Sequence, residues 1–587
     1  MPGGLLNLIS YGNQNIILNG NPSKTFFKSV YSKYTNFGLQ KFRIDFDGLR
    51  NLNLTESSTF KFKVPRYADL LMDTYLVVNL PNVWSPILPP SENVDSGGVQ
   101  TLNNIWKPYE FKWIKDIGTQ MIERVRFTIG GLTIQEFTGQ YLRCMVERDF
   151  NSVKKDLYYK MTGNINELND PANAFERNGC YPNSYPVNGD DYMTLGPEPS
   201  IRSRKLYIPL NIWFTLASKM AFPLVSLQYQ ELHIEIDLRP INQLFTVRDI
   251  ETIVYPTSNH SSITVGSDIK PDFSKNIFKF YRFLQPPPWK IDNNIATLQK
   301  WVDKRTNWNA DIHLISTYGF LSDDEVKIFA ANEQRYLIKE VHQYTHYNIV
   351  DSAKPLLNSS YGMVSNWMWY FQRNDVSLRN QWSNYTNWKY ETQPFPLIDP
   401  SGCFDLIGNI NINGTQNAPS IQSLDVNPAN NIGGFNTNYK ITGNYRVENQ
   451  KNIMITWGLL LNGKYRETTQ SAGVLDYIEK YTRTSGNAHD GLYCYNFCLD
   501  TNPFVFQPCG AINISKFNTI EFEITTYPPP LNPLAQISNI CDVDGLIIGV
   551  DKPVWNLYSY TYDVNIMEER YNVLSFVGGN AGLMYAR

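Results

Sequence analysis

The sequence predicts an all-β protein, and three observations lead to that prediction. Apolar and polar residues alternate in many short stretches, as in TFKFKVP, where Phe60, Phe62 and Val64 are separated by lysines. Such alternation is typical of strands with one face on a core. Aromatic residues make up 14% of the chain, and 37 of its residues are tyrosines, which favour strands. Asn-rich stretches such as NNIGGFNTN would supply the turns between strands.

Further strands are predicted along the whole chain. The stretches LHIEIDL (232–238) and IEFEIT (520–525) alternate aliphatic or aromatic residues with polar ones, and NLYSYTYDV (556–564) alternates tyrosines with small polar residues. All-β domains often reach ~200–250 residues, so two large domains fit a chain of 587 residues as well as four small ones do.

Few helices are expected. The best candidate is FLSDDEVKIFAANEQRYL (320–337), in which Ser322 and Glu325 have the spacing of a capping box. This helix lies just past the middle of the chain, where a junction between two domains would fall. GVLDYIEKY (473–481) is a second candidate. Irregular segments rich in Pro, Gly and Asn are expected at 81–110, 163–200 and 251–310, and loops of this length usually contact a partner or carry function.

Two segments of the chain resemble each other faintly. AFPLVSLQYQELHIEIDL in the first half and GAINISKFNTIEFEITTYPPP in the second half each place a short apolar strand and a Ser before a turn and an alternating strand that contains Glu. This pattern indicates one module used twice.

Composition excludes several classes of protein. The net charge is −3, so no sustained positive field would attract nucleic acid. No apolar run approaches the ~18–20 residues of a membrane span. The start MPGGLLNLIS has neither the basic region of a signal peptide nor the Met-Gly of a myristoylation site. Seven cysteines are an odd and sparse set for this length, and they favour folding in a reducing compartment.

One stretch matches most of a phosphate-binding loop. It runs from Gly458 to Gly463 and Lys464, but Tyr465 stands where a Ser or Thr should bind Mg²⁺. An apolar strand leads into Asn462-Gly463 and a second strand follows. Asn-Gly between two strands is the strongest short hairpin signal, so a hairpin is predicted here.

The candidate metal ligands also favour structural interpretations. His342 and His346 have the spacing of zinc ligands on a helix, but their segment alternates like a strand. The spacing of Cys494, Cys498, Cys509 and Cys541 fits no compact metal knuckle. Asp542 and Asp544 resemble the start of a calcium loop that lacks its closing Glu. The sequence therefore predicts no enzyme, no metal and no cofactor.

The N-terminal stretch GGLLNLISYGNQNIILNGNPSKTFFKSVYSKYTNF resembles the N-terminal signature of the major capsid proteins of nucleocytoplasmic large DNA viruses. That signature is approximately Gly-Gly-Leu, Tyr-Gly, Leu-x-Gly-Asn-Pro, Thr-Phe-Phe-Lys, Val-Tyr and Thr-Asn-Phe. The residues that we assign to this base segment are Gly20, Asn21, Pro22, Phe26, Phe27, Lys28, Tyr31, Asn36 and Phe37.

Later segments are similar to the same family in the same order. They include IPLNIWFTLASKMAFPLVSLQYQELHIEIDL, STYGFLSDDEVKIFAANEQRYLIKEV, GLYCYNFCLDTNPFVFQPCGAINISKFN and the C-terminal RYNVLSFVGGNAGLMYAR. The chain departs from the family where Cys509 replaces a Ser after Gln-Pro, and where Tyr34 stands in place of a common His.

The resemblance implies a fold and a function. The family folds as two consecutive eight-stranded jelly rolls with long loops and a few short helices. We therefore expect a base segment at 1–37, a first jelly roll at 38–334 and a second at 335–587. The family's homotrimers have a nearly hexagonal outline and tile the icosahedral shell of the virion. The gene would be expressed late, and assembly would take place in the host cytoplasm.

The resemblance also implies partners. These are further copies of the chain, neighbouring capsomers, minor capsid and penton proteins, and an underlying internal membrane reached through minor proteins, with no direct contact to nucleic acid. In the family the base segment lies toward the inside of the shell, so its aromatic and basic residues would be interface groups. Two alternatives remain open: a double jelly-roll scaffold that is not retained in the mature shell, and a glycan-binding tandem β-sandwich protein.

Overall fold

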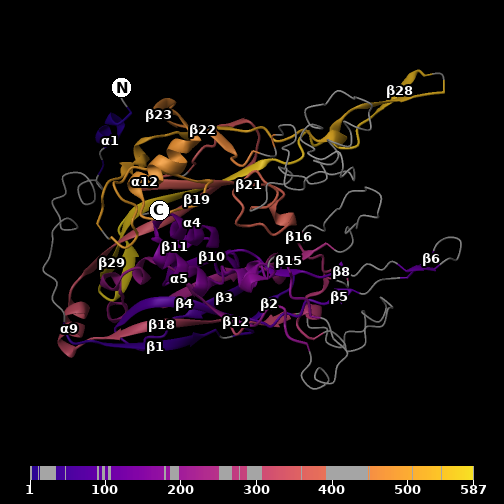
Figure 1. Ribbon diagram of the computed structural model, residues 1–587. Coiled ribbons are helices and arrows are strands. Elements are labelled where there is room, and N and C mark those ends of the chain that lie inside the picture. The colour runs from indigo at the N-terminus through magenta and orange to yellow at the C-terminus, as the bar shows by residue number, and fades with distance from the viewer. Residues whose placement is uncertain are drawn as a thin grey trace, which may run out of the picture.

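The protein folds into two β-sandwiches stacked side by side, with short helices between and around them, as the computed structural model in Figure 1 shows. The structure describes residues 3–10, 12, 35–46, 48–88, 92–94, 100–102, 107–177, 180–184, 197–249, 268–275, 278–286, 307–358, 360–391, 447, 450–505, 507–543 and 545–585.

The first sandwich faces two antiparallel sheets toward each other. One sheet has the order β1 (Gly38–Asp45), β18 (His313–Phe320), β4 (Leu70–Leu80) and β12 (Arg204–Pro209). The other has the order β11 (Leu132–Phe137), β10 (Ile122–Ile129), β14 (Leu232–Leu238) and β3 (Ser58–Lys63). First and last strands lie side by side, and strands that follow each other often lie in different sheets. This is the strand order of a jelly roll.

The second sandwich repeats this order. One sheet contains β19 (Gln334–Ile349), β29 (Tyr562–Val577), β21 (Met363–Arg373) and β24 (Leu492–Asn496). The other contains β20 (Ser352–Ala353), β26 (Ile520–Thr526), β22 (Met454–Leu461) and β23 (Lys464–Ser471). The prediction of an all-β protein with two jelly rolls is therefore confirmed.

The faint repeat in the sequence falls on equivalent places in the two sandwiches. In the first, β13 (Phe222–Pro223) pairs with β4, a 3₁₀ turn (Leu224–Ser226) follows, and β14 comes next. In the second, β25 (Ile512–Asn513) pairs with β21, a 3₁₀ turn (Ile514–Lys516) follows, and β26 comes next. Two similar segments of sequence thus form the same local structure.

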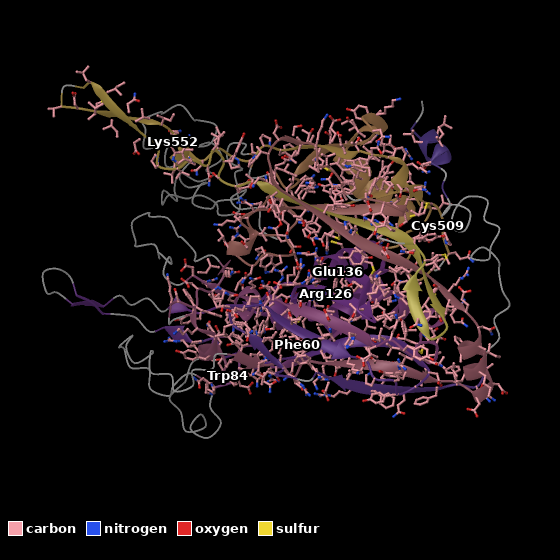
Figure 2. The ribbon with its side chains drawn as sticks, turned by 180° about the vertical axis from the view of Figure 1, so that it is seen from behind. Phe60, Trp84, Arg126, Glu136, Cys509 and Lys552 are labelled. Atoms are coloured by element: carbon pink, nitrogen blue, oxygen red, sulfur yellow. The ribbon has the colours of Figure 1, made fainter. Side chains whose placement is uncertain are left out.

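Several long connections leave the two sandwiches at one end of the molecule. In the first sandwich they contain β5 (Ile87–Leu88), β6 (Glu92–Val94), β7 (Gln100–Leu102), β8 (Lys107–Pro108) and β16 (Asp268–Ile269). In the second, the connection between β26 and β29 forms a hairpin of β27 (Ser538–Cys541) and β28 (Ile547–Asp551). This hairpin projects away from the body of the molecule, as Figure 2 shows; Lys552, labelled there, directly follows β28. We call the end with these connections the loop end.

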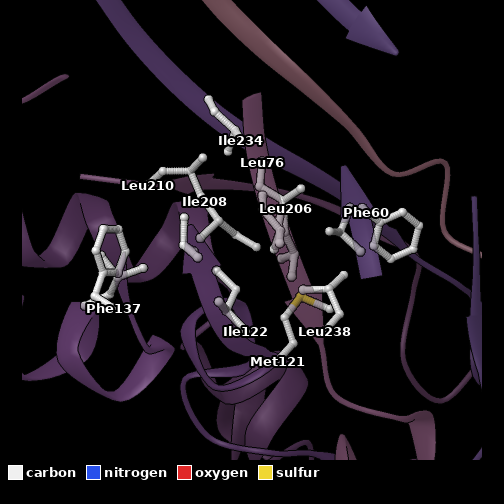
Figure 3. Packing of buried hydrophobic residues seen from close by; sticks show 14 of the residues in the cluster. Phe60, Leu76, Met121, Ile122, Phe137, Leu206, Ile208, Leu210, Ile234 and Leu238 are labelled. Atoms are coloured by element: carbon white, nitrogen blue, oxygen red, sulfur yellow. The ribbon is translucent and has the colours of Figure 1, made fainter. Parts of the chain in front are cut away.

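Each sandwich has a core built by alternation. Along β3 the residues are buried and exposed in turn, so Phe60 and Phe62 face inward while the lysines face solvent. Figure 3 shows Phe60 beside Leu238 and Leu206, residues that come from both sheets of the first sandwich.

The adjacent strands β21 and β29 are buried on both faces. Nearly every residue of these two strands is buried, including Trp367 and Trp369 of β21, because one face packs on the second core and the other on the first sandwich. Strands covered on both sides lose the polar-apolar alternation.

The predicted helices exist, but one detail of the prediction is wrong. α9 (Asp323–Ala331) lies between β18 and β19, at the junction of the sandwiches, and a helical turn at Val474–Ile478 continues as α12 (Glu479–Arg483). The capping box is not formed: the Ser322 side chain makes no capping hydrogen bond. Glu325 instead accepts a hydrogen bond of 2.6 Å from the Thr35 hydroxyl, so a tertiary contact replaced the local one.

Two helices lie in a region where none was predicted. They are α4 (Gly139–Asp149) and α5 (Ser152–Thr162), each with a side chain that caps its first turn, Thr138 and Asn151. Gly163 ends α5 in the left-handed conformation at φ 81°. These are ordinary start and stop signals, but the charged residues of GQYLRCMVERD concealed the fact that every residue of α4 is buried.

The Asn-Gly hairpin is confirmed. β22 and β23 pair directly across Asn462 and Gly463, which have φ angles of 50° and 72°. Two successive positive φ angles are the signature of a type I′ turn, whose twist matches that of the strands. The phosphate-loop interpretation is therefore excluded at this position, because no helix follows. Within the described residues no helix is long and apolar enough to cross a membrane.

Candidate functional site

The predicted base segment is described only at its two ends. Gly20, Asn21, Pro22, Phe26, Phe27, Lys28 and Tyr31 lie outside the described residues. Asn36 and Phe37 come directly before β1 and are exposed, Phe37 at 59%. Thr35 is fixed to α9 by its bond to Glu325.

The N-terminal end of the segment contacts the other sandwich. α1 (Leu5–Ile9) packs Leu6 against the second core, and the Arg466 side chain on β23 donates a hydrogen bond of 3.2 Å to Asn7. The segment that starts on the second sandwich thus reaches β1 of the first. Figure 1 places α1 and α9 away from the loop end, at the opposite end of the molecule.

The main polar cluster of the protein lies between the two sandwiches. Arg148 of α4 donates to Asp149 at 2.7 Å, to Glu569 of β29 at 2.8 Å and to Asn366 of β21 at 2.9 Å. Tyr141 donates to Glu569 at 3.0 Å. Arg148, Asp149 and Glu569 are almost wholly buried, with side chains no more than 1% exposed. We call this group the interface cluster.

Burial and charge compete in the interface cluster. Burial would raise the pKa of Glu569, but the positive charges of Arg148 and Lys339 outweigh it and lower that pKa to about 2. Burial raises the pKa of Asp149 and is only partly opposed by Arg148. Burial would lower the pKa of Arg148, but its two carboxylate neighbours raise it well above the usual value. Buried charges are tolerated only when paired and hydrogen-bonded in this way.

A second polar cluster joins α4 to a loop of the second sandwich. Arg143 donates to Asp116 at 2.7 Å, and Ser383 donates to the same carboxylate oxygen at 2.8 Å. The Tyr385 hydroxyl donates to Gln140 at 2.5 Å. Burial would raise the pKa of Asp116, but Arg143 and Lys115 lower it overall. The two clusters attach successive turns of α4 to the second sandwich.

Apolar contacts continue the interface toward α9. Phe576 of β29 packs on Phe222 of the first sandwich with ring centroids 5.2 Å apart, and Tyr336 of β19 packs on Trp213 at 5.3 Å. β29 then turns back into β30 (Asn580–Leu583), where the Gly579 carbonyl accepts hydrogen bonds from the Gln228 and Tyr229 amides. The interface between the sandwiches thus combines buried, paired charges near α4 with aromatic contacts toward α9.

The candidate metal ligands do not come together. His342 and His346 lie on β19, as predicted, whereas Cys541 lies in β27 of the projecting hairpin and Cys494 lies in β24 of another sheet. Across the described ranges there is no group of three His, Cys, Asp or Glu side chains that could hold a metal ion.

One pair of cysteines lies close together. The side chains of Cys498 and Cys509 hydrogen-bond, which lowers the pKa of Cys509 to about 5 and raises that of Cys498. Cys509 also donates to the Asp500 carbonyl at 3.0 Å. Both residues are free thiols.

Comparison with known families identifies the chain. Residues 25–272 match a family described as "Major capsid protein N-terminus", and residues 325–582 match one described as "Large eukaryotic DNA virus major capsid protein". The chain belongs to the major capsid proteins of large eukaryotic DNA viruses. The two matches fall on the two sandwiches, so each jelly roll of this capsid protein is recognised separately.

Two relatives align with this chain over its full length. The chain is 24% identical to the "Major capsid protein" of Phaeocystis pouchetii virus and 22% identical to that of Paramecium bursaria Chlorella virus 1, with 100% of both chains covered in each comparison. Among solved structures it is similar to the PBCV-1 virus capsid, with a TM-score of 0.54, 17% identity and 96% and 100% of the two chains covered. The Faustovirus major capsid protein gives a TM-score of 0.55 at 12% identity, with 95% and 93% covered. These neighbours are double jelly-roll capsid proteins.

The interface cluster was not predicted from the sequence of this capsid protein. Arg148 and Glu569 are 421 residues apart, and each resembles an ordinary solvent-facing charge in its own segment. The signal that was available is that MVSNWMWYF in β21 is apolar except for Ser365 and Asn366, which indicates a strand covered on both faces. This signal indicates that another element covers the second face of β21, but it does not identify that element.

Proposed function

We propose that three copies of this chain form a trimeric capsomer with a nearly hexagonal outline, and that such capsomers tile the icosahedral shell of a large DNA virus. Two sandwiches with the same strand order in one chain support this proposal. A cyclic trimer would present six similar bodies around its axis, and a closed ring leaves no interface unfilled.

The observation that carries the proposal is the interface cluster. A tile must keep its two halves at a set angle if its outline is to match its neighbours. Arg148 ties α4 to β21 and β29 through its buried bonds to Asn366 and Glu569, and these bonds are lost if the sandwiches rotate. This is the arrangement expected of a rigid building block rather than of two domains that move against each other.

We further propose that the chain acts without catalysis. Its candidate phosphate loop is a hairpin and its candidate zinc ligands lie along one strand. Its partners would be other copies of the chain, minor capsid and penton proteins and, through minor proteins, an internal membrane. Assembly would take place in the host cytoplasm.

The division of the chain follows from the same proposal. We assign 1–37 to a base segment, 38–334 to the first jelly roll and 335–587 to the second. The start of β1 at Gly38 and of β19 at Gln334 supports these boundaries to within a residue. The base segment would lie on the inside of the shell, opposite the loop end, where α1 and Thr35 hold its two ends.

Mass measurement and electron microscopy of the purified protein test the proposal. We expect particles of three times the 67.6 kDa of one chain, with a hexagonal outline in projection. A stable monomer would contradict the proposal. In purified virions this chain should be the dominant protein. If it were a scaffold that is not retained, it would be nearly absent from virions. If it were a glycan-binding protein, the monomer would bind to a glycan array.

A further inference from the structure

The hairpin at the loop end exposes large apolar side chains far more densely than the other described parts of the chain. It comprises residues 531–543 and 545–558, which we call the arm. Eleven large apolar side chains between Leu531 and Leu557 are at least 46% exposed. Nine of them are at least 60% exposed: Leu531, Leu534, Ile537, Val543, Leu546, Ile547, Ile548, Val550 and Trp555.

The arm is a built element. Its base is closed by the Asn532 amide, which donates to the Leu557 carbonyl at 2.8 Å, and by the Ser559 amide, which donates to Pro530 at 2.9 Å. Its tip is closed by the Asp542 carboxylate, which accepts from the Leu546 amide at 2.9 Å. Three consecutive prolines precede the base and stiffen it.

The arm is a two-stranded hairpin of β27 and β28, with no further strand paired to it among the described residues. An isolated two-stranded hairpin is marginally stable in water, and its open edges and apolar faces favour association. Apolar residues lie on both faces, since Ile540 covers Gly549 while Val550 points to the opposite side. The arm is therefore suited to be enclosed by a partner.

The exposed area matches what a stable protein interface needs. Eleven such side chains offer on the order of 500–800 Å² of apolar surface. Each partner in a standard protein interface buries about 800 Å². An exposed patch of this size on a soluble protein marks an interaction site.

The chemistry of the arm selects a protein partner. Its described charged residues are Asp542, Asp551 and Lys552, a net negative set that does not suit nucleic acid or an anionic membrane. Its aromatic residues are Tyr558, at the base, and Trp555, whose ring lies 4.8 Å from the Lys552 ammonium. Glycan sites use aromatic platforms surrounded by polar groups, whereas this surface consists mainly of Leu, Ile and Val.

We propose that the arm docks on a second copy of this chain and clasps the trimer at its loop end. Every copy carries one arm, so a cyclic arrangement in which each arm covers the next copy leaves no arm exposed. A different partner protein could cover every arm only if one copy of it were present for each copy of this chain. This inference rests on the proposed function, because the trimer is its setting.

Removing the arm tests this inference. In the main variant, residues 533–556 are replaced by a two-residue Asn-Gly turn, which the hydrogen bond between Asn532 and Leu557 allows. In a second variant, Ile548→Asp, the arm stays but gains a charge. The matched control is Ile328→Asp on α9, an Ile that is 57% exposed at the opposite end of the molecule.

The readout is the trimer dissociation constant, measured by sedimentation or mass photometry. We expect both arm variants to raise it by at least about 100-fold and the control to leave it unchanged. Hydrogen exchange should show amides of 538–551 protected in wild-type trimers and exposed in dissociated chains. An unchanged thermal unfolding midpoint of the dissociated main variant would show that its body still folds.

Two contrary outcomes are distinguishable. If the wild-type chain forms no trimer, the proposed function fails. If the wild-type chain and both arm variants form equally stable trimers, the proposed function stands and the arm inference is wrong. Loss of a minor capsid protein from shells built of such stable trimers would show that the arm serves that partner instead.

Discussion

Single buried charges hold the two jelly rolls together. Glu569 accepts bonds from Arg148 at 2.8 Å, Asn366 at 2.9 Å and Tyr141 at 3.0 Å, so each of its donors loses a partner if the carboxylate changes. Leaving a buried charge without its counter-charge costs more than the pair itself contributes. The contribution of this residue is therefore best measured by removing its charge.

We predict that Glu569→Gln lowers the free energy of unfolding by about 3 kcal/mol, because Arg148 keeps only Asp149 as a counter-charge. Chemical or thermal unfolding of the purified protein measures this. The control is Glu136→Gln, which removes a carboxylate that is 42% exposed beside Arg124 and should cost less than about 1 kcal/mol. Equal effects of the two substitutions would contradict a special role for the interface cluster.

The same carboxylate predicts a dependence on pH. Because the pKa of Glu569 is lowered to about 2 in the folded protein, its stabilising effect is complete above its ordinary pKa, about 4.5, and is lost as pH falls toward 2. The pKa values of Glu147 and Asp116 are also lowered in the folded protein, so these groups add to the same pH dependence. The pKa of Asp149 is raised, so this group acts in the opposite direction. The difference in unfolding temperature between wild type and Glu569→Gln should therefore be constant from pH 7 to 5 and shrink below pH 4.5. A difference that stays constant down to pH 3 would contradict this assignment.

At the scale of elements, α4 depends on a close approach that only glycine permits. Gly139 begins this helix, and a Cβ atom there would collide with the carbonyl oxygens of Thr119 and Ile122, which are backbone atoms. Backbone cannot move aside as a flexible side chain can. This contact places α4 between the two sandwiches and so positions the interface cluster.

We expect Gly139→Ala to destabilise the protein by about 3 kcal/mol or to prevent soluble folding. Gly582→Ala in β30 is the matched control, because its added Cβ meets nothing within 4 Å, and it should change stability by less than about 1 kcal/mol. Soluble yield and the unfolding midpoint measure both variants. A well-folded Gly139→Ala protein of normal stability would show that α4 can shift without loss.

At the scale of the whole molecule, the two ends differ in kind. One end carries the long connections and the arm, and the other carries α9, α1 and the start of β1. An antiparallel sandwich sends alternate connections to opposite ends, so long insertions in alternate connections collect on one side. A tile with two distinct faces can meet solvent with one and the shell interior with the other.

Truncation of residues 1–37 tests the division between these faces. We predict that the truncated chain still folds and forms trimers, since β1 begins at Gly38 and the interface cluster is untouched. Shell assembly should be impaired, because the base segment would be missing from the inner face. Electron microscopy of assembly reactions measures this, and shells of normal size and number from the truncated chain would refute the role of the segment.

Local patterns in the sequence were sufficient for much of this fold. Alternation placed β3, β14 and β26, the Asn462-Gly463 pair placed a hairpin, and two similar segments indicated a repeated module, because each depends only on residues close together in the chain. The resemblance to capsid proteins supplied the arrangement of strands, which no local pattern determines.

Only the tertiary structure decided which polar residues are buried. Arg148 and Glu569 resemble surface charges until α4 is placed against β29, and Ser322 with Glu325 resembled a cap until Thr35 reached the same carboxylate. Whether a polar residue is buried and paired depends on neighbours hundreds of residues away. The energy of such a residue therefore cannot be inferred from any single segment of the sequence. The local sequence determined that this protein is made of alternating strands; long-range packing determined that two sandwiches became one body.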